Sequence, residues 1–402
     1  MKTRVVITGI GIVSPIGNNF EAFAQSLQAG ACGAGPITCF DAKAFSHPPQ
    51  VYEVKNFDAH GQGTHILDPF IQYAVAAAGE ALVCAGFKPE SVDPYRIGIA
   101  VSSSKGGVHT LDRFKERFYK HPSAILGARI YSNSVPNFGA QWIARRWKIH
   151  GPSKCYVAAC ATGTVAITEG AQMVADGTVD YCLAGASDAS VVPLMIAAYQ
   201  NMKVLAKDGL KPFDLNRGGF LVGEGAGVLF LEKLESALAR KAKIYGEVLG
   251  GAYAMDGYDL LHFSNENDAL AHAFRRLFKN RGVDPDSVDY IHLHGTGTKV
   301  GDIYETEQIK KAFGKKARHI PMSSTKAATG HMLGASGAVG TIAALAGMEK
   351  GFVPPTLFLQ KPDPACDLNY TPCKSGTSKI TTSVTISMGF GGHVAVLAIR
   401  KY

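Results

Sequence analysis

The sequence has little charge and no long apolar run. Charged residues make up 18% of its 402 positions, and no segment reaches the roughly 18 consecutive apolar residues that a membrane-spanning helix needs. We therefore expect no membrane association. No dense stripe of Lys and Arg with interleaved aromatic residues occurs either, so we expect no nucleic-acid binding. The net charge of +8 fits an acidic protein partner or a phosphate-bearing substrate.

Cysteine spacing typical of metal sites is also missing. The eight cysteines are scattered, and none forms a Cys-x-x-Cys pair. A chain of this size can bury a large core without disulfides, which favours reduced thiols and a cytoplasmic protein. His292 and His294 would share one face of a strand, but no third ligand has suitable local spacing. A metal site is the less favoured interpretation, and none is predicted.

A dinucleotide-binding motif is incomplete. Gly9 and Gly11 follow a strand-like run, but Ser14, followed by Pro15, stands where the fingerprint needs its third glycine. A tight turn after a strand explains these glycines, and no bound nucleotide cofactor is predicted.

Glycine and alternating apolar segments are abundant, with 45 glycines in the chain. Runs typical of buried strands lie at 5–7, 96–101, 181–184, 222–231, 244–249, 290–293 and 381–387. Helical apolar spacing lies at 65–86, 161–175, 267–279, 302–313 and 334–348. This alternation predicts a layered α/β fold. A strand followed by Gly-x-Gly occurs at 9–11 and again at 295–297, which is a weak sign of internal duplication.

Cys160, in the stretch AACATG, is the first candidate nucleophile. Free cysteine is usually buried and inert, so its position must argue for reactivity. It directly precedes the helix predicted from 161, where the free N–H groups and the positive end of the helix dipole favour a thiolate. The small residues around it leave room for a substrate.

Two loop histidines complete a possible Cys/His site. His294 follows a strand in HLHGTGT, and His331 lies in the Gly- and Ser-rich segment SSTKAATGHMLGASG. Phe390 is the one bulky residue among the glycines of GFGG. This arrangement is typical of a mobile gate or of a backbone N–H that binds an oxyanion. One Cys and two His in turns at strand ends predict nucleophilic catalysis more specifically than any one of them alone.

The sequence resembles the β-ketoacyl-ACP synthases, most of all the type II elongating synthases of bacterial fatty acid synthesis. The segments that carry the resemblance are RVVITGIGIVSPIGN, DPFIQYAVAAAGEAL, GPSKCYVAACATG, LVGEGAGVLFLE, HGTGTKVGD, SSTKAATGHMLGASGA and GFGGH. The resemblance implies a thiolase-like α/β fold of two similar halves, each with a five-stranded sheet, in a five-layered α-β-α-β-α core. It places the nucleophilic cysteine in a half at 1–250 and the two histidines in a half at 251–402.

The family's chemistry implies roles for these residues. Cys160 accepts an acyl group from acyl carrier protein, while the backbone N–H groups of Cys160 and Phe390 hold the oxyanion. His294 and His331 stabilise the enolate that malonyl-carrier protein forms on losing CO₂. The carbanion then attacks the acyl-Cys160. The resemblance implies no bound cofactor, because phosphopantetheine arrives on the carrier protein.

Further residues match supporting positions of the family. Thr296 and Thr298 match residues that hydrogen-bond the pantetheine arm, and Phe390 matches the gating aromatic. Lys326 matches the active-site lysine and is expected to organise His331; Asp302 and Glu305 lie near it. The resemblance also implies a dimer, either of two identical chains or with a chain-length-factor-like subunit.

The sequence departs from the family in the carrier-docking segment and near the site. The stretch NFDAHGQGTHIL lacks the usual Lys and Arg, so docking would use other basic residues, with Lys203, Lys207 and Lys211 as candidates. Gly340 stands where a Glu is usual near the active-site lysine, and Met388 where a Phe begins the gate.

Lys105 is the most informative departure. It occupies the position of a small or branched apolar residue at the floor of the acyl pocket, near the dimer interface. A buried ammonium is costly unless it is paired. We therefore expect a shortened or polar acyl pocket, with Lys105 paired to a partner subunit.

Two alternatives stay open. The chain could be the active ketosynthase of a type II polyketide or polyene system, because the catalytically dead partner in such systems lacks the cysteine. A Cys/His thioester hydrolase is the alternative of another class; it needs a histidine basic enough to activate water and has no need of the Thr296/Thr298 loop.

Overall fold

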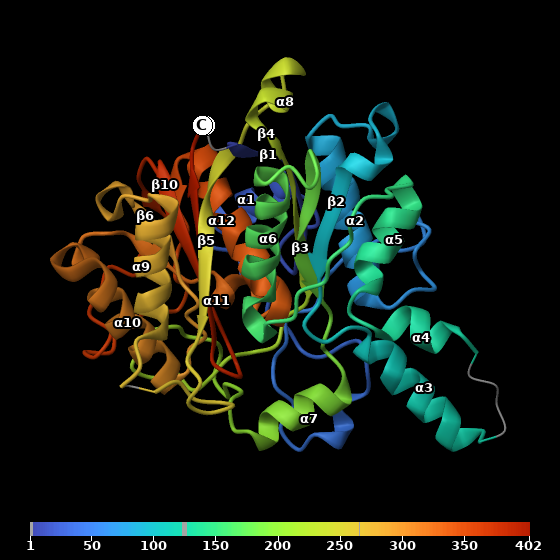
Figure 1. The fold of residues 1–402 in the computed structure, drawn as a ribbon. Coiled ribbons are helices and arrows are strands. Elements are labelled where there is room, and N and C mark those ends of the chain that lie inside the picture. Colours follow the sequence, from blue (N-terminus) through green and yellow to red (C-terminus); the bar gives the residue numbers. More distant parts are fainter. Residues whose placement is uncertain (1–2, 123–126, 265) are drawn as a thin grey trace.

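A single mixed sheet runs through the part of the chain that the computed structural model describes, residues 3–122, 127–264 and 266–402. Its nine strands lie in the order β2-β3-β4-β1-β5-β11-β10-β6-β7 (Figure 1). They are β1 (Val5–Val13), β2 (Ile97–Ser102), β3 (Tyr181–Asp188), β4 (Gly225–Lys233), β5 (Gly246–Met255), β6 (Tyr290–His292), β7 (Met322–Ser323), β10 (Thr382–Gly389) and β11 (His393–Arg400). A separate pair joins β8 (Phe352–Val353) to β9 (Gly376–Thr377).

The strand pairing repeats itself. In the first half β2 is parallel to β3, β3 antiparallel to β4, and β4 antiparallel to β1. In the second half β6 is parallel to β10, β10 antiparallel to β11, and β11 antiparallel to β5. The weak Gly-x-Gly repeat in the sequence therefore accompanies a duplicated topology.

The two halves of the sheet are continuous, and the described residues form four strands in the first half and five in the second, where the resemblance implied five in each. The sheets join because β1 and β5 pair antiparallel, Val5 with Val248 and Ile7 with Gly246. The first half has four strands, and a single parallel bridge between Ile99 and Ser153 takes the place of its fifth strand. Residue 250 lies inside β5, and residues 1, 2 and 123–126 lie outside the described part, so the division at 250 stays a prediction.

The helices form layers on and between the two halves of the sheet. α6 (Thr162–Ala175) and α12 (Ser336–Lys350) lie in the centre, and each contacts strands of both halves. α2 (Pro69–Cys84) and α5 (Phe138–Trp147) cover one outer face, and α9 (Ala269–Arg281) and α10 (Lys299–Phe313) the other (Figure 1). This is the five-layered α-β-α-β-α arrangement. The remaining helices are α1 (Phe20–Gln28), α3 (Val108–Lys120), α4 (Arg129–Ser134), α7 (Pro193–Asn201), α8 (Leu234–Ala239) and α11 (Lys326–Thr329).

Small residues let the two central helices touch. A Cβ atom at Gly163 of α6 would lie 2.7 Å from the backbone nitrogen of Ala338 in α12, so only glycine fits there. This close approach sets the distance between the two helix N-termini, where the candidate site lies.

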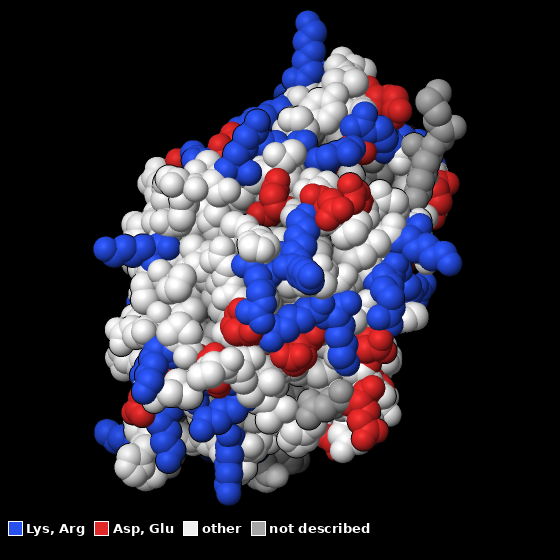
Figure 2. All heavy atoms as spheres, turned by 90° about the vertical axis from the view of Figure 1, so that its left-hand side faces the viewer, with Lys and Arg blue, Asp and Glu red and all other residues white. Residues whose placement is uncertain are grey.

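The face over α9 and α10 carries Lys and Arg interspersed with Asp and Glu (Figure 2). Arg275 pairs with Asp268 at 2.6 Å, and Lys310 pairs with Glu307 at 3.0 Å. This is a solvated face of mixed charge. Among the described residues, no helix has the length and apolar character that crossing a membrane requires.

Candidate active site

Two matching turns bring the central groups together. The 3-10 turn Ala159–Ala161 precedes α6, and the 3-10 turn Leu333–Ala335 precedes α12. Each begins with a non-glycine residue in the left-handed region, Ala159 at φ 46° and Leu333 at φ 48°. The turns pack against each other, which places Cys160 of the first beside His331, just before the second.

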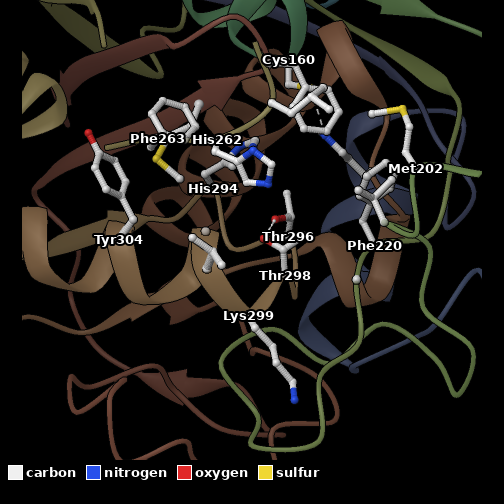
Figure 3. A pocket seen from close by; sticks show the side chains of 18 of the residues that line it. Cys160, Met202, Phe220, His262, Phe263, His294, Thr296, Thr298, Lys299 and Tyr304 are labelled. Carbon is white, nitrogen blue, oxygen red and sulfur yellow. Dashed lines mark hydrogen bonds between the residues drawn. The ribbon is translucent and has the colours of Figure 1, made fainter. Parts of the chain in front are cut away.

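Cys160, His331 and His294 converge on one point. Nε2 of His331 lies 3.1 Å from Sγ of Cys160, and its Nδ1 lies 2.9 Å from Oγ of Ser336. The ring of His294 stands edge-to-face to that of His331, with centroids 5.5 Å apart. Figure 3 shows Cys160 and His294 at the inner end of one cavity. The structure therefore brings together the three residues that the sequence singled out.

The surroundings of the Cys160 thiol shift its pKa in opposite directions. Burial raises its pKa to about 11, whereas the charges of Lys105 and Lys326 and the backbone N–H of Phe390 lower it. The expectation of a thiolate favoured by the helix start is therefore wrong for the resting chain, because desolvation outweighs the stabilising groups. Proton transfer to His331 Nε2 offers the sulfur a route to react from the thiol form.

Both histidines are neutral. The pKa of His294 and that of His331 lie well below the usual range, first because of burial and then because of the nearby Lys326 charge. Neutral imidazoles can donate an N–H to a developing oxyanion without transferring a second proton to a carbanion.

Lys326 bonds the backbone of His294, while its charge acts on both histidines, so the expectation that it organises His331 stays a prediction. Its Nζ donates to the backbone oxygen of His294. Burial lowers the pKa of Lys326, and the charges of Glu305 and Asp302 oppose that effect. Glu305 accepts from the backbone N–H of His294 at 2.6 Å and of Gly295 at 2.7 Å. The lysine and Glu305 thus hold the backbone of the HGTGT loop from two sides.

Thr296 and Thr298 face the cavity from this loop (Figure 3). Their hydroxyl oxygens lie 3.2 Å apart. Asp302 accepts from the N–H of Gly297 at 3.1 Å and forms a buried ion pair with Arg217 at 3.4 Å. No sequence motif predicts Arg217, whose guanidinium also donates to the backbone oxygen of Thr298 at 3.2 Å. It comes from a distant segment, NRGGF, without motif spacing.

Phe390 lines the cavity beside Met388. The next two residues, Gly391 and Gly392, both have φ 84°, a conformation that favours glycine. Gly391 donates to the backbone oxygen of Leu260 at 2.7 Å, which connects the gate segment to a second loop. A Cβ at Gly389 would lie 2.9 Å from the nitrogen of Cys160, so glycine permits this close approach.

The cavity has a volume of about 380 Å³ and is apolar over much of its wall. Lys203 and Lys299 are among its lining residues, and Figure 3 shows Lys299 at the opposite end of the lining from Cys160. Of the lysines expected to dock the carrier protein, Lys203 lines the cavity. Lys207 is exposed and Lys211 is half-buried, and neither of them lines the cavity. The sequence analysis did not single out Lys299. Further lining residues that it missed are Met202, Phe220, Leu261, Phe263 and Tyr304.

Lys105 is exposed in the single chain and does not line this cavity. The expected buried ammonium is therefore not found here, because the residue lies in the bend between β2 and α3. Its backbone N–H lies 3.4 Å from Asp188, a fully buried carboxylate that the sequence analysis missed. A role at the floor of an acyl pocket stays a prediction.

The described residues contain no cluster of three or more His, Cys, Asp or Glu side chains that could hold a metal ion.

The β-ketoacyl synthase N-terminal domain family matches residues 2–237, and the C-terminal domain family matches residues 245–360. The chain belongs to the β-ketoacyl synthase family.

Relatives and solved structures agree with this assignment over the full length. The chain is 36% identical to 3-oxoacyl-[acyl-carrier-protein] synthase 2 of Synechocystis, covering 100% of the chain and 99% of the relative. It is 34% identical to the Staphylococcus aureus protein of the same name, covering 99% and 98%. The ishigamide ketosynthase/chain length factor superposes with TM-score 0.94 at 32% identity, and a Burkholderia phymatum β-ketoacyl synthase with 0.92 at 29%, each covering 100% of both chains. The fold is thiolase-like, and the chain is a condensing acyltransferase.

Proposed function

We propose that this β-ketoacyl synthase condenses an acyl group on Cys160 with malonyl-acyl carrier protein and releases a 3-ketoacyl product two carbons longer. The 3.1 Å contact between Cys160 and a neutral His331, with His294 beside them, carries the proposal. A pair of neutral donors next to a nucleophile suits enolate chemistry.

In the first step, the sulfur of Cys160 attacks the thioester carbon of the acyl-carrier protein. Its proton moves to His331 Nε2, and the backbone N–H groups of Cys160 and Phe390 receive the oxyanion. The bond to the pantetheine sulfur breaks, and that sulfur takes the proton from His331. The acyl group is then held on Cys160.

In the second step, the malonyl arm enters along Thr296 and Thr298. Its thioester oxygen lies between His294 and His331, the bond to the carboxylate breaks, and CO₂ leaves. The electron pair forms an enolate whose carbon attacks the acyl carbon on Cys160. The carbon–sulfur bond breaks, the sulfur of Cys160 leaves as a thiolate, and a proton from solvent restores the thiol for another cycle.

We propose a cytoplasmic dimer that meets its carrier protein at the cavity mouth. Lys203 and Lys299 supply positive charge there, and Lys207 and Lys211 extend it along the neighbouring segment. Acidic carrier proteins would be attracted to such a mouth. The phosphopantetheine belongs to the carrier protein and is treated as substrate.

A specialised polyketide or polyene pathway is the second candidate. It is supported by the likeness to the ishigamide ketosynthase/chain length factor and, at TM-score 0.91 and 28% identity, to a ketosynthase solved with its type II polyketide acyl-carrier protein and a hexaketide. A heterodimer with a chain-length-factor-like subunit would follow. Native mass of the chain alone, and with the products of neighbouring genes, separates the two assemblies.

Intact mass spectrometry tests the activity. We expect the purified chain to gain one acyl mass from acyl-carrier protein and to form 3-ketoacyl-carrier protein after malonyl-carrier protein is added. Cys160→Ala should do neither. Release of free acid without condensation would favour the thioester hydrolase, and an unmodified enzyme with unchanged carriers would refute the proposal.

A further inference from the structure

His292 is a buried histidine for which the proposed reaction has no role. It ends β6, two residues before His294, and its side chain is 2% exposed. Its Nε2 lies 3.0 Å from Oγ1 of Thr325, and its Nδ1 has no hydrogen-bond partner among the described residues. Burial and the charge of Lys326 lower its pKa to about 3, so the ring is neutral.

Gly340 of α12 lies directly against this ring. A Cβ atom at position 340 would come within 2.5 Å of Cε1 and 2.6 Å of Nδ1 of His292. Interiors are too closely packed to absorb such an overlap without moving the ring. The imidazole and a side chain at 340 therefore exclude one another.

The ring also belongs to a set of bonds between two site segments. His292 meets Thr325, and the N–H of Leu293 donates to the backbone oxygen of Ser323 at 2.8 Å. Further along the same two segments, Lys326 donates to the backbone oxygen of His294. Thr325 precedes α11, and its backbone oxygen accepts from the N–H groups of Ala328 at 2.9 Å and Thr329 at 3.1 Å in that helical turn.

We propose that His292 is a positioning residue for the decarboxylation step. It fixes Thr325 and thereby the start of α11, so that Lys326 stays on the carbonyl of His294 and the His294 ring keeps its place. Without a carboxylate at 340, Glu305 and Asp302 are the acids whose charges act on Lys326. The inference rests on the proposed condensing function and deepens it.

Separate half-reactions test this role. His292→Ala and Thr325→Val should each slow CO₂ release from malonyl-carrier protein by about tenfold or more, and leave acyl transfer to Cys160 within about twofold. His292→Asn, which can still bond Thr325, should recover most of the rate. Thr341→Val is the matched control, because Thr341 is a buried threonine next to Gly340 whose hydroxyl bonds Gly337 at 2.9 Å and lies 3.5 Å from that of Thr385, so it does not bond His292 or Thr325.

Gly340→Ala should displace the ring and slow CO₂ release as His292→Ala does. The double variant should be no slower than His292→Ala alone, because both changes act through one contact. Equal loss of both half-reactions, or additive effects in the double variant, would overturn the inference. If the unmodified enzyme acylates Cys160 but releases no CO₂, the proposed function fails and the inference with it. If CO₂ is released and the variants match the control, only the inference fails.

Discussion

Oδ2 of Asp188, at the end of β3, accepts a 2.6 Å hydrogen bond from the N–H of Gly334 in the turn before α12. In the other half, Gly389 at the end of β10 packs against the nitrogen of Cys160 in the turn before α6. Each strand end thus supports the turn that belongs to the opposite half. The separation of Cys160 from His331 depends on both contacts.

Asp188→Asn tests the first of these supports. Asp188 is fully buried and accepts hydrogen bonds from Gly334, Ser103 and Ser104. The NH₂ group of an asparagine at this position would face these donors and could not accept from them, so they would lose their partners. We expect a loss of about 1–3 kcal/mol in unfolding free energy and slower acylation of Cys160. Urea unfolding and intact mass measure the two effects. Asp208→Asn, at an exposed position, is the control; an equal response in both variants contradicts the assignment.

The two histidines should separate the half-reactions. His331 touches the sulfur and takes part in both steps, whereas His294 acts in the second. His294→Ala should keep acyl transfer within about threefold and slow CO₂ release by about 10²- to 10³-fold. His331→Ala should slow both. Rates of acyl-enzyme formation and of CO₂ release measure this, and a His294→Ala variant that cannot be acylated would contradict it.

Sequence patterns predicted the layered fold and the three central residues, because each leaves a local signal, whereas the two similar halves were implied by the family resemblance. Periodicity marks the helices and strands, and Cys160, His294 and His331 all lie in small-residue turns at strand ends. The groups that were missed have no local signal. Arg217 reaches Asp302 from 85 positions away in the chain, and its role depends on tertiary contacts alone.

The joining of the two sheets could not be predicted for a similar reason. The β1–β5 pairing involves three residue pairs at strand ends, which alternation of apolar residues does not reveal. The pKa of Cys160 was misjudged because a position at a helix start is visible in sequence, while the degree of desolvation is not. The bond from Lys326 to the backbone of His294 was not predicted, since family position does not specify a hydrogen-bond partner.

The alkylation rate of Cys160 should depend on pH and on Lys105. With a pKa of about 11, the rate with iodoacetamide in the resting enzyme should still rise well above pH 9. Lys105 lowers this pKa, so Lys105→Met removes a positive charge, disfavours the thiolate and raises the pKa further. At about pH 8 we expect several-fold slower labelling of the Cys160 peptide. Lys88→Met, at an exposed position, is the matched control; faster labelling in Lys105→Met would reverse the sign and refute the assignment.

Acyl-chain preference tests the predicted role of Lys105 at the floor of an acyl pocket. Its backbone lies beside Asp188, near Cys160, and an ammonium at the end of an acyl channel is costly to cover with hydrocarbon. The unmodified enzyme should therefore transfer hexanoyl groups faster than lauroyl to palmitoyl groups. Lys105→Ile, which supplies a branched apolar side chain, should raise palmitoyl transfer about tenfold relative to hexanoyl. Competition between acyl-carrier proteins, read by intact mass of the acyl-enzyme, measures the ratio. Equal extension of all these chains by the unmodified enzyme would exclude a shortened or polar pocket.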